Sequence, residues 1–337
     1  MAWTKAIGDG RVLWWIVVVG LLADCLAHTT GSEALRVRTE AMVVDRQKPG
    51  RTHFGALTLL SSLVLRADDT RFGGLSGVAL DASGRTLYAV SDRGYGLSAR
   101  LIHDTTGRLT GIDHWTIVPL KTPGGQPVKQ HMIDAEAVAQ EPDGSWLVAF
   151  EQQHRIWRYP ASSQAFEALP EPLEVPGELS RAPNNGGLEA MGRLPDGRLL
   201  VLTEQFYNAD GSLKGWLLAE GQAVDVSYLA SDGFVPTDLA TLSQGDVLVL
   251  ERRFRPTSGV AVRLRHILGH QFRPQARLHG RELVSLNKPL VIDNFEGLAV
   301  RESPQGEILL YWISDDNFKF FQQTLLLQFR FHLPDRG

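Results

Sequence analysis

Residues 187–204 read GLEAMGRLPDGRLLVLTE, a pattern that recurs along the chain and from which the fold can be predicted. A short apolar run contains one glutamate, Glu189. A Pro-Asp-Gly turn follows, and then a second apolar run ends on another glutamate, Glu204. Two short apolar runs joined by a turn that contains glycine indicate a β-hairpin, and continuous apolar runs of this length are typical of buried strands.

Four more segments repeat this hairpin: GLSGVALDASGRTLYAVSD (74–92), DAEAVAQEPDGSWLVAFE (134–151), PTDLATLSQGDVLVLE (236–251) and NFEGLAVRESPQGEILLYWISD (294–315). A polar or acidic residue enters the first run of every copy, at Ser76, Glu136, Glu189, Asp238 and Glu296. These entry residues are 60, 53, 49 and 58 positions apart. That period is typical of propeller blades and exceeds those of leucine-rich and ankyrin repeats.

The residues between copies also read as short strands, so each period holds about four of them. The sequence therefore predicts an all-β fold, a β-propeller of four-stranded blades. Five blades are favoured, and six remain possible if one copy is degenerate. After the last copy one good strand remains, at 324–333, and the strand at 56–67 has no blade of its own. We expect the N-terminal strand to pair into the last blade and close the ring, because closure removes exposed sheet edges.

The N-terminal segment differs from the rest of the chain. Lys5 and Arg11 precede an apolar run at 12–27, the pattern of a secretory signal peptide. The run is shorter than the roughly 20 apolar residues that span a membrane, and an uncleaved signal anchor is the alternative. We expect residues 1–27 to be this signal, 28–54 a linker and 55–335 the propeller domain. The location would be periplasmic or secreted, with no membrane span in the mature form; a membrane-anchored form is the less favoured alternative.

Composition narrows the possible partners. The chain has 337 residues, a net charge of −4 and a pI near 6.2. Nucleic-acid-binding domains usually carry a basic patch and a high pI, so we expect no nucleic-acid partner. The one cysteine, Cys25, lies in the signal segment, so a cleaved chain would have no thiol chemistry. No G-x-S-x-G motif is present, which argues against an α/β-hydrolase serine. We expect a monomer.

The innermost strand of each blade lines the central channel of a propeller, and the first strand of each repeat is the candidate for it. The five entry residues would then converge on one axis. Several carboxylates in a confined space repel one another, so some must bind a cation or a proton. Oxygen ligands suit Ca²⁺ or Mg²⁺. The alternative is architectural, with the acids bonding turn amides or interblade arginines.

A second set of acids ends the second strand of each copy: Asp92, Glu151, Glu204, Glu251 and Asp315. We expect these exit residues to cap the hairpins or to pair with the arginines that follow them. Arginines at a channel mouth, such as Arg93 and Arg252, can also bind phosphate or carboxylate through bidentate hydrogen bonds.

Four of the five copies resemble the bacterial phytase-like family, described as "esterase-like activity of phytase". The segments that carry the resemblance are GGLSGVALDASGRTLYAVSDRG, DAEAVAQEPDGSWLVAFEQQHRIWRY, GGLEAMGRLPDGRLLVLTE and NFEGLAV with YWISDDNF, and it covers roughly residues 55–330. It implies an exported β-propeller that hydrolyses phosphate or carboxylate esters with calcium, as propeller phytases do. The sequence is also comparable with propeller lactonases, which place Glu, Asn and Asp around calcium.

Together these observations give a working hypothesis of a Ca²⁺-dependent hydrolase acting on a small anionic ester or phosphoester. Its assigned residues are Glu136, Glu189, Asp238 and Glu296 as metal ligands, Glu136, Glu189 and Glu296 as catalytic groups, and Arg93, Arg252 and Asn185 as substrate contacts. Two alternatives stay open, because a propeller fold does not choose between them. One is a non-catalytic propeller that binds a ligand or a protein, and the other is a purely structural use of the acids.

Overall fold

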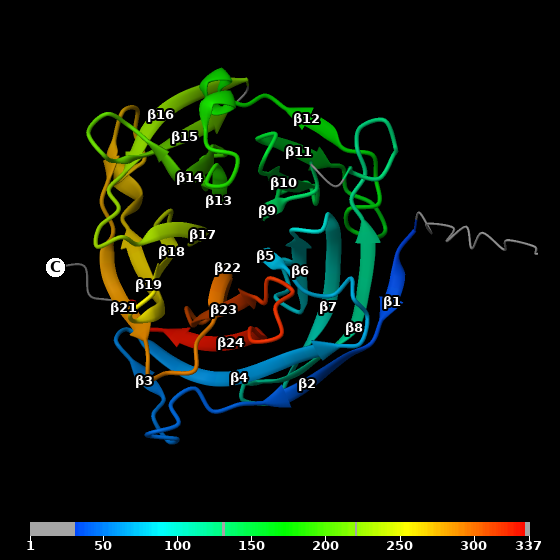
Figure 1. Ribbon diagram of the computed structural model, residues 1–337, viewed down its shortest axis with the longest axis vertical. Helices are drawn as coiled ribbons and strands as arrows, with labels where there is room; N and C mark the ends of the chain where they lie inside the picture. The colour runs from blue at the N-terminus through cyan, green and yellow to red at the C-terminus, as the bar shows by residue number, and fades with distance from the viewer. Residues whose placement is uncertain (1–30, 130–131, 220, 334–337) are drawn as a thin grey trace, which may run out of the picture.

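The computed structural model describes residues 31–129, 132–219 and 221–333. Within these ranges five small sheets form a ring around a central axis (Figure 1), which confirms the five-bladed propeller. Strands β5, β9, β13, β17 and β22 lie nearest this axis, and residues of all five line a pocket there, which marks the central channel. The proposed signal segment, residues 1–27, lies outside the described residues. Among the described residues, none of the helices has the length and hydropathy of a membrane-spanning segment.

The first two blades follow the predicted hairpins. Blade 1 contains, from the channel outward, β5 (Leu75–Leu80), β6 (Thr86–Ser91), β7 (Tyr95–His103), β8 (Leu109–Pro119) and β1 (Glu33–Leu35). Blade 2 contains β9 (Ala135–Gln140), β10 (Trp146–Phe150), β11 (Arg155–Tyr159) and β12 (Glu171–Leu173). A short 3-10 helix, Gly177–Arg181, precedes the third blade.

The chain leaves blade 4 once to add a strand to blade 3. Blade 3 contains β13 (Leu188–Arg193), β14 (Leu199–Tyr207), β15 (Leu213–Ala219), β16 (Gln222–Tyr228) and β20 (Arg277–Leu278). Blade 4 contains β17 (Val235–Thr241), β18 (Val247–Arg255), β19 (Gly259–Ile267) and β21 (Arg281–Asn287). The chain leaves β19 through a 3-10 turn, Gly269–Gln271, and adds β20 parallel to β16 before it returns to β21.

Blade 5 is built from both ends of the chain. It contains β22 (Asn294–Glu302), β23 (Ile308–Asp315), β24 (Thr324–Phe331), β4 (Leu57–Ala67) and β2 (Val37–Ala41), and β3 (His53–Phe54) pairs with β4. β4 runs antiparallel to β24 over eight residue pairs, so the N-terminal strand closes the ring as predicted. The segment 28–54, expected to be a linker, contributes β1 to blade 1 and β2 to blade 5.

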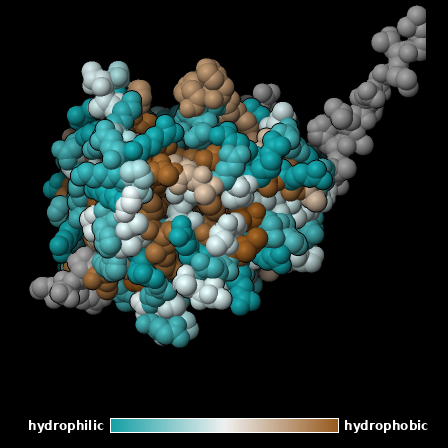
Figure 2. All heavy atoms as spheres, turned by 90° about the horizontal axis from the view of Figure 1, so that it is seen from below, coloured by the Kyte–Doolittle hydropathy of each residue, from teal (hydrophilic) through white to brown (hydrophobic). Residues whose placement is uncertain are grey.

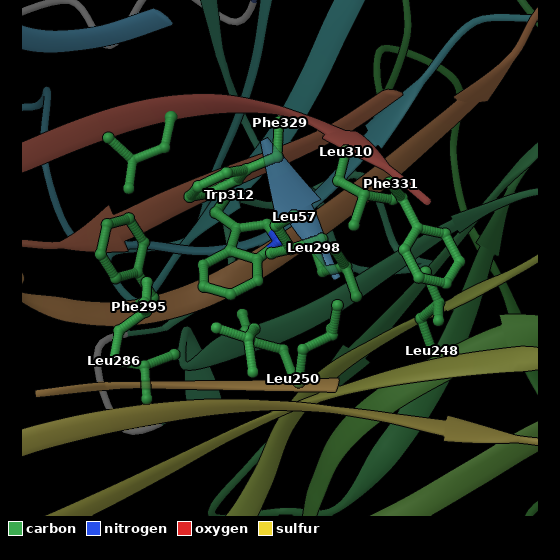
Figure 3. Packing of buried hydrophobic residues seen from close by; sticks show 14 of the residues in the cluster. Leu57, Leu248, Leu250, Leu286, Phe295, Leu298, Leu310, Trp312, Phe329 and Phe331 are labelled. Atoms are coloured by element: carbon green, nitrogen blue, oxygen red, sulfur yellow. The ribbon is translucent and has the colours of Figure 1, made fainter. Parts of the chain in front are cut away.

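Five apolar clusters hold the ring together, one between each pair of neighbouring blades. Figure 3 shows the cluster between blades 4 and 5, where Trp312 packs 4.9 Å from Phe329 and 5.9 Å from Phe295 between ring centroids. Each blade therefore buries both of its faces. This explains why the second strands read as continuous apolar runs: every residue of β23 and β10 is buried. The rim of the disc, seen edge-on in Figure 2, is mostly polar with scattered apolar residues.

Small residues let the innermost strands approach one another near the axis. A Cβ atom added at Gly77 of β5 would lie 2.6 Å from the backbone nitrogen of Val138 in β9. A Cβ at Gly297 of β22 would lie 2.9 Å from the carbonyl oxygen of Ser76. Both distances are closer than real contacts allow, so glycine is required at these two positions.

Gly77→Ala is expected to lower the free energy of unfolding by about 1–3 kcal/mol, because the methyl group overpacks the contact between blades 1 and 2. Chemical denaturation measures this change. Gly177→Ala is the matched control, since a Cβ at Gly177 meets nothing within 4 Å. Equal stability of the two variants would contradict the close approach of the inner strands.

Candidate functional site

A β-bulge places the entry residues of the innermost strands. In blades 2, 3 and 5 the pairing register skips one residue, which is Glu136, Glu189 and Glu296 respectively. At a bulge, two residues of one strand lie opposite one residue of the partner strand, so the extra residue is unpaired. The local kink changes the direction in which its side chain points. In blade 1 the extra residue falls at Ser76–Gly77. In blade 4 it is Thr237, whose hydroxyl donates a hydrogen bond to the carbonyl oxygen of Phe295 at 3.1 Å.

The three bulged glutamates form one electrostatic cluster. Burial raises the pKa of Glu136 well above its usual value, and the charges of Asp134 and Glu296 raise it further. Burial likewise raises the pKa of Glu189, with Glu136 as the strongest of its carboxylate neighbours. Burial also raises the pKa of Glu296. Carboxylates held close together in a partly dry site favour a bound proton or a bound cation over full ionisation.

Exit residues join the same cluster, which the sequence analysis did not predict. Glu151 is buried, and its Oε1 accepts hydrogen bonds from the backbone nitrogens of Gly186 and Gly187 at 2.6 and 2.5 Å. Burial still raises the pKa of Glu151 to about 7. Burial and the charge of Glu296 raise the pKa of Asp315 to about 9. Glu151 therefore caps backbone amides, as expected, and it is also a member of the acid cluster.

Asp92 and Asp134 extend the cluster toward blade 1. Burial and the charge of Asp134 raise the pKa of Asp92 to about 7. Asp92 Oδ1 is buried and has no hydrogen-bond partner among the described residues. Asp134, Glu136 and Glu151 each offer a carboxylate oxygen within 4.8 Å of the other two. Three converging oxygens and one orphaned buried oxygen nearby form a donor set that fits a hard divalent cation.

Arg252 is the expected substrate contact that the structure brings to the cluster. Its Nη2 lies 3.2 Å from Glu204 Oε1 and 3.5 Å from Glu296 Oε1. Burial alone would lower the pKa of Arg252, but the negative charges of Glu296 and Glu204 outweigh burial and raise the pKa above its usual value. The guanidinium is therefore a fixed positive group at the edge of the acid cluster.

The other two expected substrate contacts lie at the periphery. Arg93 is exposed, donates to the carbonyl oxygen of Thr70 at 2.9 Å, and stacks on Phe318 with 3.2 Å between its Cζ and the ring centroid. Its charge lowers the pKa of neighbouring Asp92, so it lies near the rim of the cluster. Asn185 is exposed in the loop before Gly186.

Asp238, expected as a fourth metal ligand, accepts hydrogen bonds from two backbone amides. It lies one position beyond the bulge and pairs with Leu250 in the ladder. Its Oδ1 accepts from the nitrogen of Leu239 at 2.8 Å, and its Oδ2 accepts from the nitrogen of Leu298 in blade 5 at 2.7 Å. At the equivalent position the other blades have glycine or alanine. The structure therefore gives Asp238 a bracing position between blades.

Asp238→Ala is expected to lower the free energy of unfolding by about 2–5 kcal/mol, because two buried amide groups lose their acceptor. The methyl group fits, since alanine occupies this position in blades 2 and 3. Asp238→Asn, which keeps one acceptor oxygen, should lose less stability. Thermal shifts with Ca²⁺ should be unchanged in the alanine variant. A lost Ca²⁺ response at unchanged stability would instead make Asp238 a ligand.

Glu251, the exit residue of blade 4, also has a separate role. Its Oε1 accepts from the hydroxyl of Tyr228 at 2.7 Å, and its Oε2 accepts from Nε of Arg263 at 2.5 Å. Glu251 is fully buried, so these contacts satisfy a carboxylate between blades 3 and 4. Blade 4 thus differs from the others at both its entry and its exit position.

These features define the class of protein: a five-bladed β-propeller with a carboxylate cluster at one mouth of its channel. The family model "Phytase-like: Esterase-like activity of phytase" matches residues 70–318, and the chain belongs to this family. The resemblance identified from the repeats is thereby confirmed. No match was found among curated proteins.

The solved structures that resemble this chain are remote in sequence, with TM-scores below 0.5. Virginiamycin B lyase from Staphylococcus aureus is 8% identical, with 88% of this chain and 99% of that chain covered and a TM-score of 0.40. A glucose dehydrogenase is 12% identical, with 88% and 99% covered and a TM-score of 0.40. A luciferin-regenerating enzyme is 12% identical, with 78% and 95% covered and a TM-score of 0.39. Similarities this remote carry no information about activity.

Proposed function

We propose that the acidic channel mouth is a divalent-cation site at which this protein hydrolyses phosphoesters or related esters. The observation that carries the proposal is the convergence of carboxylates from several blades, with raised pKa values and with Arg252 as the arginine in direct contact with them. Structural acids normally have their own dedicated partners: Arg263 pairs with Glu251, and two backbone amides donate to Asp238. The cluster around Glu136 has an excess of negative charge that a cation would neutralise.

The donor set suits a hard cation. Asp134, Glu136 and Glu151 would hold it, with Glu189 and Glu296 next to them, and the all-oxygen chemistry favours Ca²⁺ or Mg²⁺. A cation bound there would polarise an ester oxygen and lower the pKa of a water molecule. Arg252 would bind the anionic part of the substrate, since its guanidinium can donate two parallel hydrogen bonds to a phosphate or carboxylate. Arg93 and Asn185, both exposed, would contact only the outer part of a larger substrate.

The carboxylates would also move the protons. In hydrolysis the water oxygen bonds to phosphorus or to the acyl carbon, and the bond to the alcohol oxygen breaks. Glu189 would take a proton from the water, and Glu296 in its protonated form would give one to the departing alcohol. Buried carboxyls with raised pKa values are suited to both roles near neutral pH.

A panel of aryl phosphates and carboxylic esters, assayed with chelator and after adding back Ca²⁺, Mg²⁺ or Mn²⁺, tests this proposal. We expect turnover that chelator abolishes and one of the cations restores. Turnover that chelator does not affect would contradict the cation role. Cation binding without turnover of any ester would favour the ligand-binding propeller.

A further inference from the structure

A pocket of about 620 Å³ opens beside the acid cluster, between blades 4 and 5. Three segments form its walls: the β18–β19 hairpin, the loop before β22 and the loop between β23 and β24. Arg252, Asn294 and Glu296 line it from the channel side. Two of these, Arg252 and Glu296, belong to the cluster described above, so a molecule in this pocket reaches the proposed reaction site.

The outer wall of the pocket is apolar and unusually exposed. Phe254 is 62% exposed and Phe321 is 67% exposed, and both line the pocket together with Leu290 and Ile292. Phe320, next to Phe321 and edge-on to it at 5.3 Å between centroids, is fully exposed. These three phenylalanines are the most exposed large apolar residues that the structure describes. Exposed apolar groups gathered at one site mark a surface that a ligand covers.

Two lysines line the same pocket as the apolar wall. Lys288 and Lys319 line the pocket and are exposed, and neither forms an ion pair with the described residues. Asp293 and Glu296 are the two acids that line the pocket, and the Asp293 carboxylate accepts hydrogen bonds from the backbone nitrogens of Asn294 and Gln323 and from Nε2 of Gln322. Together with Arg252, the lysines make the pocket attractive to an anion, even though it adjoins an acidic cluster.

We propose that the substrate is an anionic ester carrying one aromatic or bulky apolar group, rather than a wholly polar, highly phosphorylated molecule. The anionic ester would lie toward Arg252 and Glu296, and the apolar group would lie against Phe254 and Phe321. A pocket of this size, with an apolar wall and a few polar groups at one end, is the usual form of a small-molecule site. This inference rests on the proposed function for the reaction, but the recognition can be measured separately.

Two non-hydrolysable probes of equal charge test the recognition: phenylphosphonate and methylphosphonate, titrated calorimetrically into the full chain with CaCl₂ present. We expect phenylphosphonate to bind about tenfold to a hundredfold more tightly, the range that burial of one aromatic group gives. The double variant with Phe254→Ala and Phe321→Ala should lose most of this preference and keep its affinity for methylphosphonate. Both side chains are exposed, so the variant should keep its fold.

Tyr207→Ala is the matched control, because Tyr207 is 50% exposed and does not line this pocket; it should keep the preference. Equal binding of both probes, an unchanged preference in the double variant, or tighter binding of inositol hexakisphosphate than of phenylphosphonate would overturn the inference. A retained preference without any ester turnover would refute the proposed function and leave the inference standing. Chelator-sensitive turnover that is fastest on small polar phosphates would support the proposed function and refute the inference about the apolar group.

Discussion

Glu189→Gln should lower ester turnover by about a hundredfold to ten-thousandfold, the range that a positioned general acid or base contributes. Glutamine has the same shape as glutamate but cannot take a proton from water. Steady-state kinetics on the best substrate of the ester panel measures the loss, which should appear in kcat.

The same variant should be more stable than the wild type when divalent cations are absent. The wild-type carboxylate is buried beside Glu136 and Glu151, so neutralising it removes both repulsion and a desolvation cost. A loss of activity combined with a gain in stability is expected of a functional residue. Glu174→Gln is the matched control, because Glu174 is exposed. Full activity in Glu189→Gln would exclude its proton-transfer role.

Without divalent cations, the melting temperature should fall as the pH rises from about 5 to 9. The carboxyls of Asp92 and Glu151 have pKa values raised to about 7, and that of Asp315 is raised to about 9. In the unfolded chain these groups titrate near pH 4. The folded protein therefore holds more protons between these values, and stability is lost as the pH rises through the folded pKa values.

Adding Ca²⁺ should reverse this fall. A cation that binds the folded state stabilises it by about 3–4 kcal/mol at a hundred to a thousand times its dissociation constant. Differential scanning calorimetry from pH 5 to 9, with chelator and with Ca²⁺, measures both effects. The variant with Glu136→Gln and Glu151→Gln should lose the Ca²⁺ response. A melting temperature that neither pH nor Ca²⁺ changes would show that these acids are architectural.

Most of the fold could be predicted because the blades repeat one buried hairpin. Burial on both faces makes the second strands continuous apolar runs, and these define the period. The strand predicted at 56–67 could be assigned to the last blade because no hairpin repeat accompanies it. The short strands β1 and β2 could not be predicted, since they are mostly polar and half-exposed and each adds little more than one apolar side chain, Leu35 or Val37, to the core.

The candidate site could be predicted less completely, for a reason of register. Glu136, Glu189 and Glu296 align because each occupies a bulge. In blade 4 the bulged residue is Thr237. Comparison of the repeats by residue type selects its neighbour Asp238, because Asp238 is the acidic residue of strand β17. The position of the exit residues was available from the hairpin itself: antiparallel pairing puts the end of the second strand opposite the start of the first. Glu151 and Asp315 therefore lie at the same channel mouth as Glu136 and Glu296.

The closing pair in blade 5 has a consequence for how the chain folds. Thr58 Oγ1 lies 2.9 Å from Nε2 of His332, although the two residues are 274 positions apart. During synthesis β4 is made long before its partner β24, which lies more than 250 positions further along the chain. Bringing β4 and β24 together closes a long loop and costs conformational entropy. This cost comes before the contact can stabilise the fold, and it therefore slows folding. Until β24 is made, the edge of β4 that it covers has no partner, and such an edge is a site for pairing with other chains.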